Sequence, residues 1–151
     1  MAQLYSDIVN LLEQAKSDIQ SSLASNNINA SGRSSDSFHV VEADGHIMLV
    51  YGGDGTAPLA TLEIGRSAGK IPYGFQDILF EWSKSKGISF PDDRQRKTFA
   101  WFLSQKIKNE GTQRHKTPVD VYSTVVNDTV EKLKPAIVQA VKDHFKNTRK
   151  P

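Results

Sequence analysis

The sequence predicts a single α+β domain. Its length and its hydrophobic pattern predict this class, and its lack of Cys limits the kinds of site it can hold. At 151 residues, the chain has about the length of one compact domain. Its apolar residues recur at helical spacing near both ends and alternate like those of a strand in between. The chain has no Cys, which excludes a disulfide framework, Cys-ligated zinc and a thiol nucleophile. We therefore expect a small antiparallel sheet packed by an N-terminal amphipathic helix and by C-terminal helices.

The first predicted element is a long amphipathic helix over residues 1–25. Leu, Ile and Ala recur every three or four positions from Leu4 to Leu23, and polar residues cover the other faces. Ser25-Asn26-Asn27 should end the helix, because Asn tolerates the left-handed backbone conformation. Residues 29–35 are polar or small and predict a loop.

Strands are predicted within residues 37–64. Phe38 and Val40 alternate with their neighbours, and Asp44-Gly45 is typical of a type I′ hairpin turn. The return strand is the apolar run 47–51, and after a flexible loop beginning at residue 52 a further short strand is expected over 59–64. These segments predict three or four antiparallel strands.

Three helical regions are predicted after the strands, over residues 74–87, 93–110 and 118–146. Gly87 should end the first of them in a Schellman motif, and Asp92-Asp93 should begin the second. Pro135 should kink or break the third near residues 131–134, and the tail 147–151 should fray. The expected core stripes are Phe75, Ile78, Leu79 and Trp82; Phe99, Phe102, Leu103 and Ile107; and Val126, Val130, Leu133, Ile137, Val141 and Phe145.

The charge is sorted along the chain. Residues 1–75 carry 4 Lys or Arg and 8 Asp or Glu, a net charge of −4, whereas residues 76–151 carry 15 and 9, a net charge of +6. This asymmetry indicates either electrostatic complementarity between neighbouring copies or a basic face for nucleic acid. An unevenly charged, solvated surface is the third interpretation.

No catalytic, cofactor-binding or metal-ligating residues are predicted. Gly65 to Lys70 departs from a phosphate-binding loop, because three residues separate the glycines and Ile71 takes the place of Ser or Thr. The four His residues lack metal-site spacing, apart from His46 with Glu42 on the hairpin, although His39 and His46 would be able to face each other there. We expect no enzyme, and the alternative is a small enzyme whose Asp, Glu or His side chains converge only in the fold.

The order of several segments resembles a known family. These segments are Ala30-Ser31-Gly32-Arg33 with the polar run to Ser37, Ala60-Thr61-Leu62-Glu63-Ile64-Gly65-Arg66 with Gly69-Lys70, Trp82 with Lys86-Gly87-Ile88, and Phe99-Ala100-Trp101-Phe102-Leu103 with Glu110-Gly111-Thr112. Together they are similar to the tail-completion and head–tail connector proteins of tailed bacteriophages, in the version common in phages of Bacteroides-like hosts. The similarity extends over nearly the whole chain.

This resemblance implies a curved sheet packed by helices and a structural protein of the virion neck. Such proteins assemble in the host cytoplasm as a hexameric or dodecameric ring between portal and tail, and the DNA passes through the ring. No catalytic residue and no cofactor is implied. On this interpretation, a loop containing Glu63, Gly65, Arg66, Gly69 and Lys70 meets a neighbouring subunit or ring.

We expect the subunit interface to be heterologous, with acidic surface at positions such as Asp18 or Glu42 facing basic surface of residues 84–116. Trp101 lies outside the predicted core stripe of its helix and should contribute apolar contact area to the subunit interface. The alternative function is a nucleic-acid-binding phage accessory protein that uses the same basic region. No membrane association is expected, because the longest apolar run is 47–51. The candidate basic face comprises Lys84, Lys86, Arg94, Arg96, Lys97, Lys106, Lys108, Arg114 and Lys116.

Overall fold

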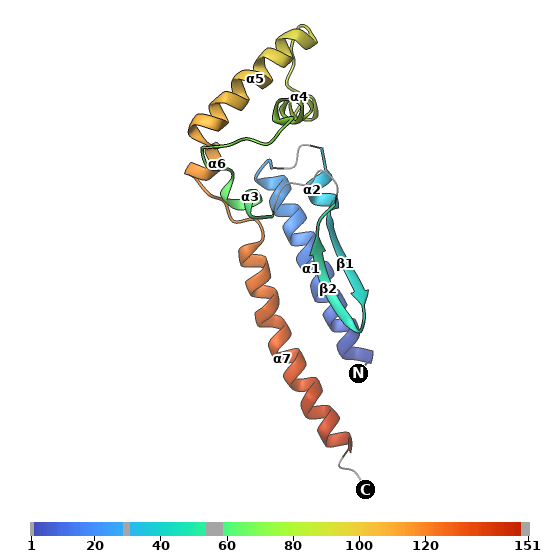
Figure 1. The fold of residues 1–151 in the computed structure, drawn as a ribbon. Helices are drawn as coiled ribbons and strands as arrows, with labels where there is room; N and C mark the ends of the chain where they lie inside the picture. The colour runs from blue at the N-terminus through green and yellow to red at the C-terminus, as the bar shows by residue number, and fades with distance from the viewer. Residues whose placement is uncertain (1, 29–30, 54–58, 149–151) are drawn as a thin grey trace.

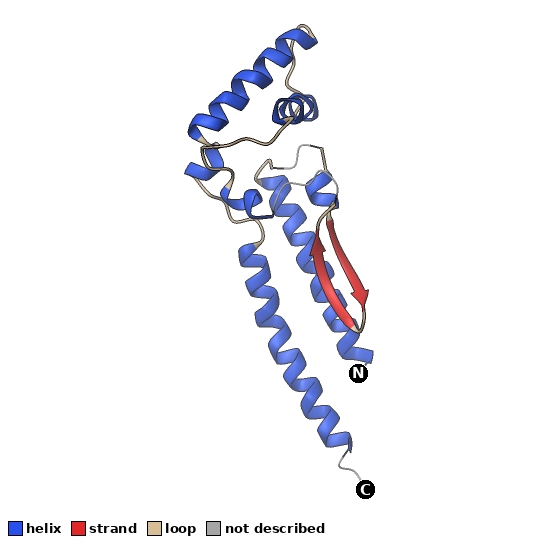
Figure 2. Cartoon of the chain, viewed as in Figure 1, coloured by secondary structure: helices blue, strands red, loops and turns tan. Residues whose placement is uncertain are grey.

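A computed structural model describes residues 2–28, 31–53 and 59–148, which are mostly helical with one small sheet (Figures 1 and 2). The predicted α+β class with an N-terminal helix is confirmed. The elements are α1 (Ala2–Ser25), α2 (Arg33–Asp36), β1 (Phe38–Ala43), β2 (His46–Tyr51), α3 (Leu59–Ile64), α4 (Phe75–Ser85), α5 (Asp93–Glu110), α6 (Gln113–Lys116) and α7 (Ser123–Thr148).

The chain forms an elongated molecule with two parts. In the first part, α1 lies between α7 and the β1–β2 hairpin and contacts both of them (Figure 1). In the second part, α4 packs against α5 at the opposite end of the molecule from the C-terminus. The short helices α3 and α6 lie between these two parts.

The first third of the chain follows its sequence signals closely. The helix α1 has the predicted extent, and Asn27 has the left-handed φ of 54° that was expected just after it. Asp44 and Gly45 both have positive φ, as a type I′ turn requires, and β1 pairs with β2 from Phe38↔Tyr51 to Ala43↔His46. In this register His39 lies opposite Val50, so the two hairpin histidines do not face each other.

The expected third strand is wrong. Residues 59–64 form the helix α3, and the sheet of the described residues has only two strands. Leu62 and Glu63 are both buried although they are adjacent, which a strand packed on one side does not allow. The predicted loop 29–35 also contains a helical turn, because α2 begins at Arg33. Most of the flexible loop expected after residue 52 lies outside the described residues.

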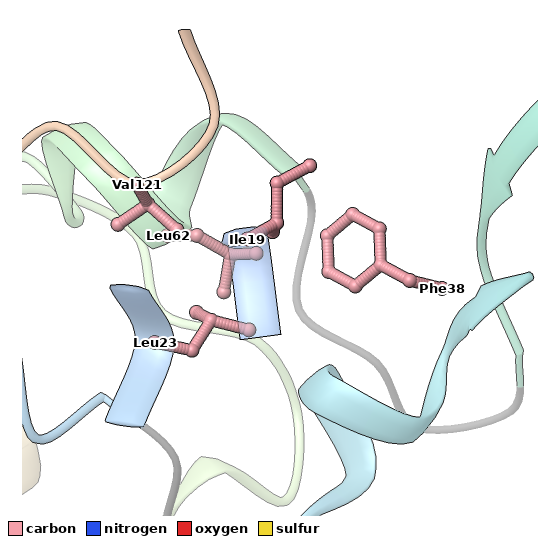
Figure 3. Close-up of a cluster of buried hydrophobic side chains, with 5 residues drawn as sticks. All are labelled: Ile19, Leu23, Phe38, Leu62 and Val121. Atoms are coloured by element: carbon pink, nitrogen blue, oxygen red, sulfur yellow. The ribbon is translucent and has the colours of Figure 1, made fainter. Parts of the chain in front are cut away.

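The larger core joins both ends of the chain (Figure 3). Ile19 and Leu23 of α1 lie beside Leu62 of α3 and Val121, and Phe38 packs against them from the start of β1. Partly buried apolar side chains, among them those of Leu49, Tyr51, Tyr122 and Val125, surround this cluster. Burial of these side chains is the main force that holds α1, α7 and the hairpin together.

A second, smaller core joins α4 and α5. Leu79, Ala100 and Ile107 are its buried apolar residues, and Ser83 and Ser104 are fully buried beside them. These small residues let the two helices approach closely. The predicted stripes were therefore wrong at Ile78 and Phe102, which are 52% and 62% exposed.

The boundaries of α4 and α5 match their predicted signals. The Ile88 N–H donates to the Ser83 carbonyl at 3.0 Å and the Gly87 N–H to the Lys84 carbonyl at 2.9 Å, which is the expected Schellman motif. The Asp92 carboxylate caps α5 by accepting from the Gln95 N–H at 2.8 Å.

The last helix differs from its prediction in three respects. It begins at Ser123 rather than at residue 118, and it continues through Pro135, so of the predicted kink or break the break does not occur. It also includes Asn147 and Thr148, which were expected to fray; the last three residues lie outside the described part. Five residues of the predicted core stripe are exposed along α7: Val126, Val130, Ile137, Val141 and Phe145.

Two backbone segments connect the two cores. The Gly69 N–H donates to the Lys108 carbonyl and the Thr112 N–H to the Arg66 carbonyl, both at 2.8 Å. A Cβ atom on Gly111 would lie 2.7 Å from the Arg66 oxygen. The approach of residues 65–69 to residues 108–112 therefore depends on glycine.

Candidate assembly surfaces

Metal-ligand geometry and surface hollows come first among the features of the described residues. No group of three or more His, Asp or Glu side chains in this part of the chain is arranged to hold a metal ion. A surface hollow of about 490 Å³ contains Asp92 and Arg94, but the Asp92 carboxylate is already used to cap α5. Among the described residues, its other lining side chains are those of Phe90, Gln95 and Thr98. Within the same residues, no helix is both long enough and apolar enough to span a bilayer.

Glu63 is the buried acidic residue of the structure, only 9% exposed. Its Oε1 accepts hydrogen bonds from the N–H groups of Val121 (3.0 Å), Tyr122 (2.8 Å) and Ser123 (2.7 Å). The Ser123 hydroxyl donates to Oε2 at 2.7 Å. Glu63 thus supplies, from α3, the acceptor that the first N–H groups of α7 lack within their own helix.

These contacts keep the carboxylate ionised. Burial alone would raise the pKa of Glu63, but the hydrogen bonds from the Ser123 hydroxyl and from three backbone N–H groups outweigh burial, so the pKa is lowered. Burial, and then the nearby Glu63 charge, raise the pKa of the Tyr122 hydroxyl. The negative charge is therefore part of the fold.

The loop expected to meet a neighbouring subunit is largely occupied within its own chain. Glu63 is bonded to the start of α7, and Gly65 is buried, where a Cβ would meet Thr112 Oγ1 and would lie 2.7 Å from the His115 nitrogen. Arg66 lies over the Phe75 ring, 5.4 Å from its centroid. Glu63 and Gly65 are thus buried, Arg66 is half-buried, and Gly69 and Lys70 are exposed, so a role of this loop in an interface stays a prediction.

Trp101 and Phe102 form an exposed aromatic pair on α5. They are 45% and 62% exposed, and their rings meet edge to face with centroids 5.0 Å apart. The predicted position of Trp101 off the core stripe agrees with this exposure. Phe102 adds an apolar side chain that the sequence pattern had assigned to the core.

The nine predicted basic residues do not form one face. The Lys86 ammonium donates to the Asn27 backbone and side-chain oxygens, Arg96 donates to Ser83 Oγ at 2.9 Å, and Arg114 donates to the Thr61 carbonyl at 3.2 Å. These three hold parts of the chain together. Burial lowers the pKa of Arg114, and burial with the nearby Arg114 charge lowers the pKa of Lys86.

The remaining basic residues are exposed. Arg94, Lys97 and Lys108 share one sector of α5 with Trp101, because helical positions separated by 3, 7 and 14 residues from Arg94 lie on one side. Lys106 lies elsewhere on the same helix, Lys84 contacts the Phe80 ring, and Lys116 pairs with Glu110 at 3.6 Å.

The sequence pattern missed two further apolar surfaces; it assigned the residues of the first to the core and did not single out those of the second. The first is the α7 stripe, which we define as Val126, Val130, Ile137 and Val141. The second is the hairpin outer face, which comprises His39, Val41, Ala43, His46, Met48 and Val50 and points away from α1. A signal for the first was present, since α7 has more apolar positions than one packing partner covers.

The chain exposes far more surface than a compact monomer does. Its accessible surface is 10159 Å², whereas a compact protein of 16.8 kDa exposes about 7,600 Å². Among the described residues, more large hydrophobic side chains are exposed than buried. Exposed large hydrophobic side chains that gather in patches can mark surfaces that bind a partner.

Comparison with protein families, with curated proteins and with solved structures finds no match for this chain. Its function is therefore inferred from its own residues.

Proposed function

We propose that this chain is a structural subunit of an oligomeric ring in the neck of a tailed phage, where the ring joins portal to tail around the DNA channel. The observation that carries the proposal is the set of exposed large hydrophobic side chains on an elongated chain with two small cores. The segment order described above supplies the phage context. No enzymatic activity is proposed.

The distribution of the exposed apolar groups supports a position between other components. The Trp101–Phe102 pair lies at the α4–α5 end of the molecule, whereas the α7 stripe and the hairpin outer face lie along its other part. A subunit that contacts neighbours in its own ring as well as portal or tail needs apolar surface at both ends. Mature virions are the proposed location.

The direct test is deletion of the coding sequence from the phage that carries it. We expect DNA-filled heads and separate tails, seen by negative-stain electron microscopy, and joined particles when the protein is supplied in trans. Antibody labelling should place the protein at the head–tail junction. Intact infectious virions from the deletion strain would show that the proposal is wrong.

The interface role of α5 is tested by Trp101→Ala and Lys97→Glu, each assayed for incorporation into neck particles at low and high salt. We expect Trp101→Ala to reduce incorporation at both salt concentrations, because about 1–3 kcal/mol of apolar contact is lost. Lys97→Glu should act mainly at low salt, because exposed ion pairs contribute about 0–1 kcal/mol and are screened. Thr98→Ala is the matched control on the same exposed side. Normal incorporation of both variants would exclude this interface.

One observation favours the alternative of nucleic-acid binding: Arg94, Lys97 and Lys108 surround Trp101 on one sector of α5. Such a surface would bind DNA phosphates with an affinity that falls steeply with salt. A connector monomer should retain duplex DNA only weakly, since channel charges act together only after assembly. Tight retention at moderate salt by the isolated chain, lost in Lys97→Glu, would favour the alternative.

A further inference from the structure

The exposed half of α5 is cationic along its whole length. No Asp or Glu occurs over residues 94–109, a span that holds five Lys or Arg. Arg96 turns inward and donates to Ser83, whereas the other four are exposed: Arg94, Lys97, Lys106 and Lys108. None of these four forms an ion pair within the part of the chain that the structure describes. Four positive charges on this side of α5 thus have no acidic partner of their own.

This surface belongs to a basic end of the molecule. Residues 66–116, which include α4, α5 and α6, carry 11 Lys or Arg and 5 Asp or Glu, whereas residues 2–53 carry 2 and 6. Two acidic residues at the ends of α5 have partners, since Asp92 caps the helix and Glu110 pairs with Lys116. The excess of positive charge therefore lies towards the α4–α5 end (Figure 1), where it would attract a polyanion.

Two aromatic side chains lie among these cations. Trp101 and Phe102, 45% and 62% exposed, occupy the middle of α5, and cations lie towards both of its ends. At about 100° per residue, Lys97 and Lys108 lie within about 40° of Trp101 around the helix, and Lys106 lies within about 40° of Phe102. The aromatic rings and the positive charges thus alternate on one exposed surface.

The other side of α5 is occupied. Ala100, Leu103 and Ile107 pack on α4, so this apolar side is not free to insert into a membrane surface, as a membrane-binding amphipathic helix requires. On the exposed side, the polar side chains of Gln95 and Asn109 lie among the cations and are able to form hydrogen bonds. Cations, exposed aromatic rings and amides on one surface are typical of proteins that bind nucleic acid.

The exposed rings favour an unpaired strand over a duplex. The face of a base is accessible for stacking on an aromatic side chain only when the base has left a duplex stack. Arg94 and Lys108 are about 21 Å apart along α5, at about 1.5 Å per residue, and Trp101 lies halfway between them. Phosphates of one strand can therefore reach cations at both ends of α5 while bases reach the rings in the middle.

We propose that the exposed half of α5 binds single-stranded nucleic acid, with Trp101 and Phe102 as the stacking surface and the four exposed cations as phosphate contacts. This binding goes beyond the proposed ring and does not rest on it. It also differs from duplex binding, because the free chain prefers the single strand. Where Trp101 contacts a neighbouring subunit, the unassembled chain is the form that binds the strand.

The presence of only two Trp residues permits a direct test by fluorescence. In Trp82→Phe, Trp101 is the sole Trp, so its emission reports on α5. We expect saturable quenching by an oligothymidylate of about 12 nucleotides or by an oligouridylate of the same length, and the two arms distinguish DNA from RNA. A duplex of equal length should bind at least about tenfold more weakly, because its bases are not free to stack.

Matched variants separate stacking from charge, with affinities measured by the anisotropy of a labelled oligonucleotide. Trp101→Ala should weaken binding about 5- to 100-fold, and Trp101→Phe, which keeps a stacking ring, should bind like the parent. Lys97→Ala should reduce the slope of log affinity against log salt by about 0.7. Lys142→Ala removes the same charge from the exposed surface of α7 and should not change the slope.

Three outcomes would overturn the proposal. The first is equal affinity for single strand and duplex with no effect of Trp101→Ala. The second is binding to vesicles of equal parts phosphatidylglycerol and phosphatidylcholine but to no oligonucleotide, which would make α5 a membrane surface. The third is self-association that Lys97→Ala abolishes, again without oligonucleotide binding, which would show that a second copy covers α5. A neck protein that binds no single strand leaves the proposed ring intact, and a strand-binding chain that virions lack leaves this binding intact.

Discussion

Glu63 shows how one side chain can fix a helix that begins sixty residues later in the sequence. Its carboxylate accepts hydrogen bonds from three N–H groups at the start of α7. These bonds hold the first turn of α7 beside the core that contains Leu62 and Val121. The sequence offered no sign of this role, because the partners become neighbours only in the folded chain. Glu63 had been expected instead in a loop that meets a neighbouring subunit.

The first prediction concerns the pH dependence of this cap. The folded pKa of Glu63 is lowered, so its contribution to stability is fully present above the ordinary value of 4.5 and is lost as pH falls through the folded pKa. We expect Glu63→Gln to be less stable than the parent at pH 7, by about 1–3 kcal/mol, and the gap to shrink below pH 4.5. Urea unfolding of both proteins at pH 7, 4 and 3 measures this difference in unfolding free energy.

Glu81→Gln is the control for this pH profile, because the Glu81 carboxylate is exposed and its salt bridge within the described part of the chain is with Lys84. It should remain within about 0.5 kcal/mol of the parent at each pH. A Glu63→Gln curve parallel to the parent from pH 7 to pH 3 would contradict the role given to the carboxylate.

A second prediction compares two glycines that have nearly the same φ. Gly87 (φ 71°) has open space where a Cβ would be placed, whereas at Gly111 (φ 76°) the Cβ would meet the Arg66 oxygen and the Ala68 nitrogen. Gly87→Ala should cost about 1–2 kcal/mol for the left-handed conformation alone. Gly111→Ala should cost about 1–3 kcal/mol more, because backbone must move. If urea unfolding gives the two variants equal losses of unfolding free energy, residues 65–69 and 108–112 can move apart without cost.

At the scale of elements, the signals that act locally were read correctly. Asn27, the Asp44-Gly45 turn, the Asp92 cap and Gly87 each act through their own backbone or through residues a few positions away, and each has its predicted conformation. α1 is long and strongly periodic, and its predicted extent was correct.

The errors arose where tertiary contacts choose between local options. The residues of α3 fit a two-residue period as well as a helical one, and the burial of Leu62 beside Glu63 decides for the helix. On α5, the small side chains of Ala100 and Ser104 permit close packing on α4 and turn Phe102 outwards. Apolar periodicity alone also does not tell which stripe of α7 is covered within the chain, so the candidate surfaces on α7 and on the hairpin were missed.

The third prediction concerns the proline inside α7. Pro135 provides no N–H for the Glu131 carbonyl, although the helix continues through it. Pro135→Ala should restore this hydrogen bond and stabilise the helix locally by about 1–3 kcal/mol. Amide exchange over residues 131–147 should slow accordingly, and exchange in α4 should not change. Unaltered exchange near residue 135 would show that the proline does not weaken the helix.

On the scale of the whole molecule, the exposed apolar surface links stability to assembly. If copies associate through their folded state, mass action raises the melting temperature with protein concentration. We expect this rise in the parent and in Gln139→Asp, which changes another side of α7, at about 2–4 °C for each kcal/mol of association. The melting temperature of Val141→Asp, which places a charge in the α7 stripe, should not change over the same range of protein concentration. Differential scanning calorimetry at several concentrations measures these values, and a concentration-independent parent would contradict self-association.

The junction of both chain ends in one core has a consequence for biosynthesis. Helices α4 and α5 are neighbours in sequence, so their contact can form while the ribosome is still translating. Ile19 and Leu23, in contrast, can be covered by Phe38 and Leu62 on one side but stay open on the other until Val121 has been synthesised, and α1 has to wait for α7 to complete its packing. A prematurely terminated chain would therefore contain a folded α4–α5 pair and an open α1, a state that cellular proteases recognise and remove. Translation itself thus selects against incomplete subunits before any of them reaches an assembly.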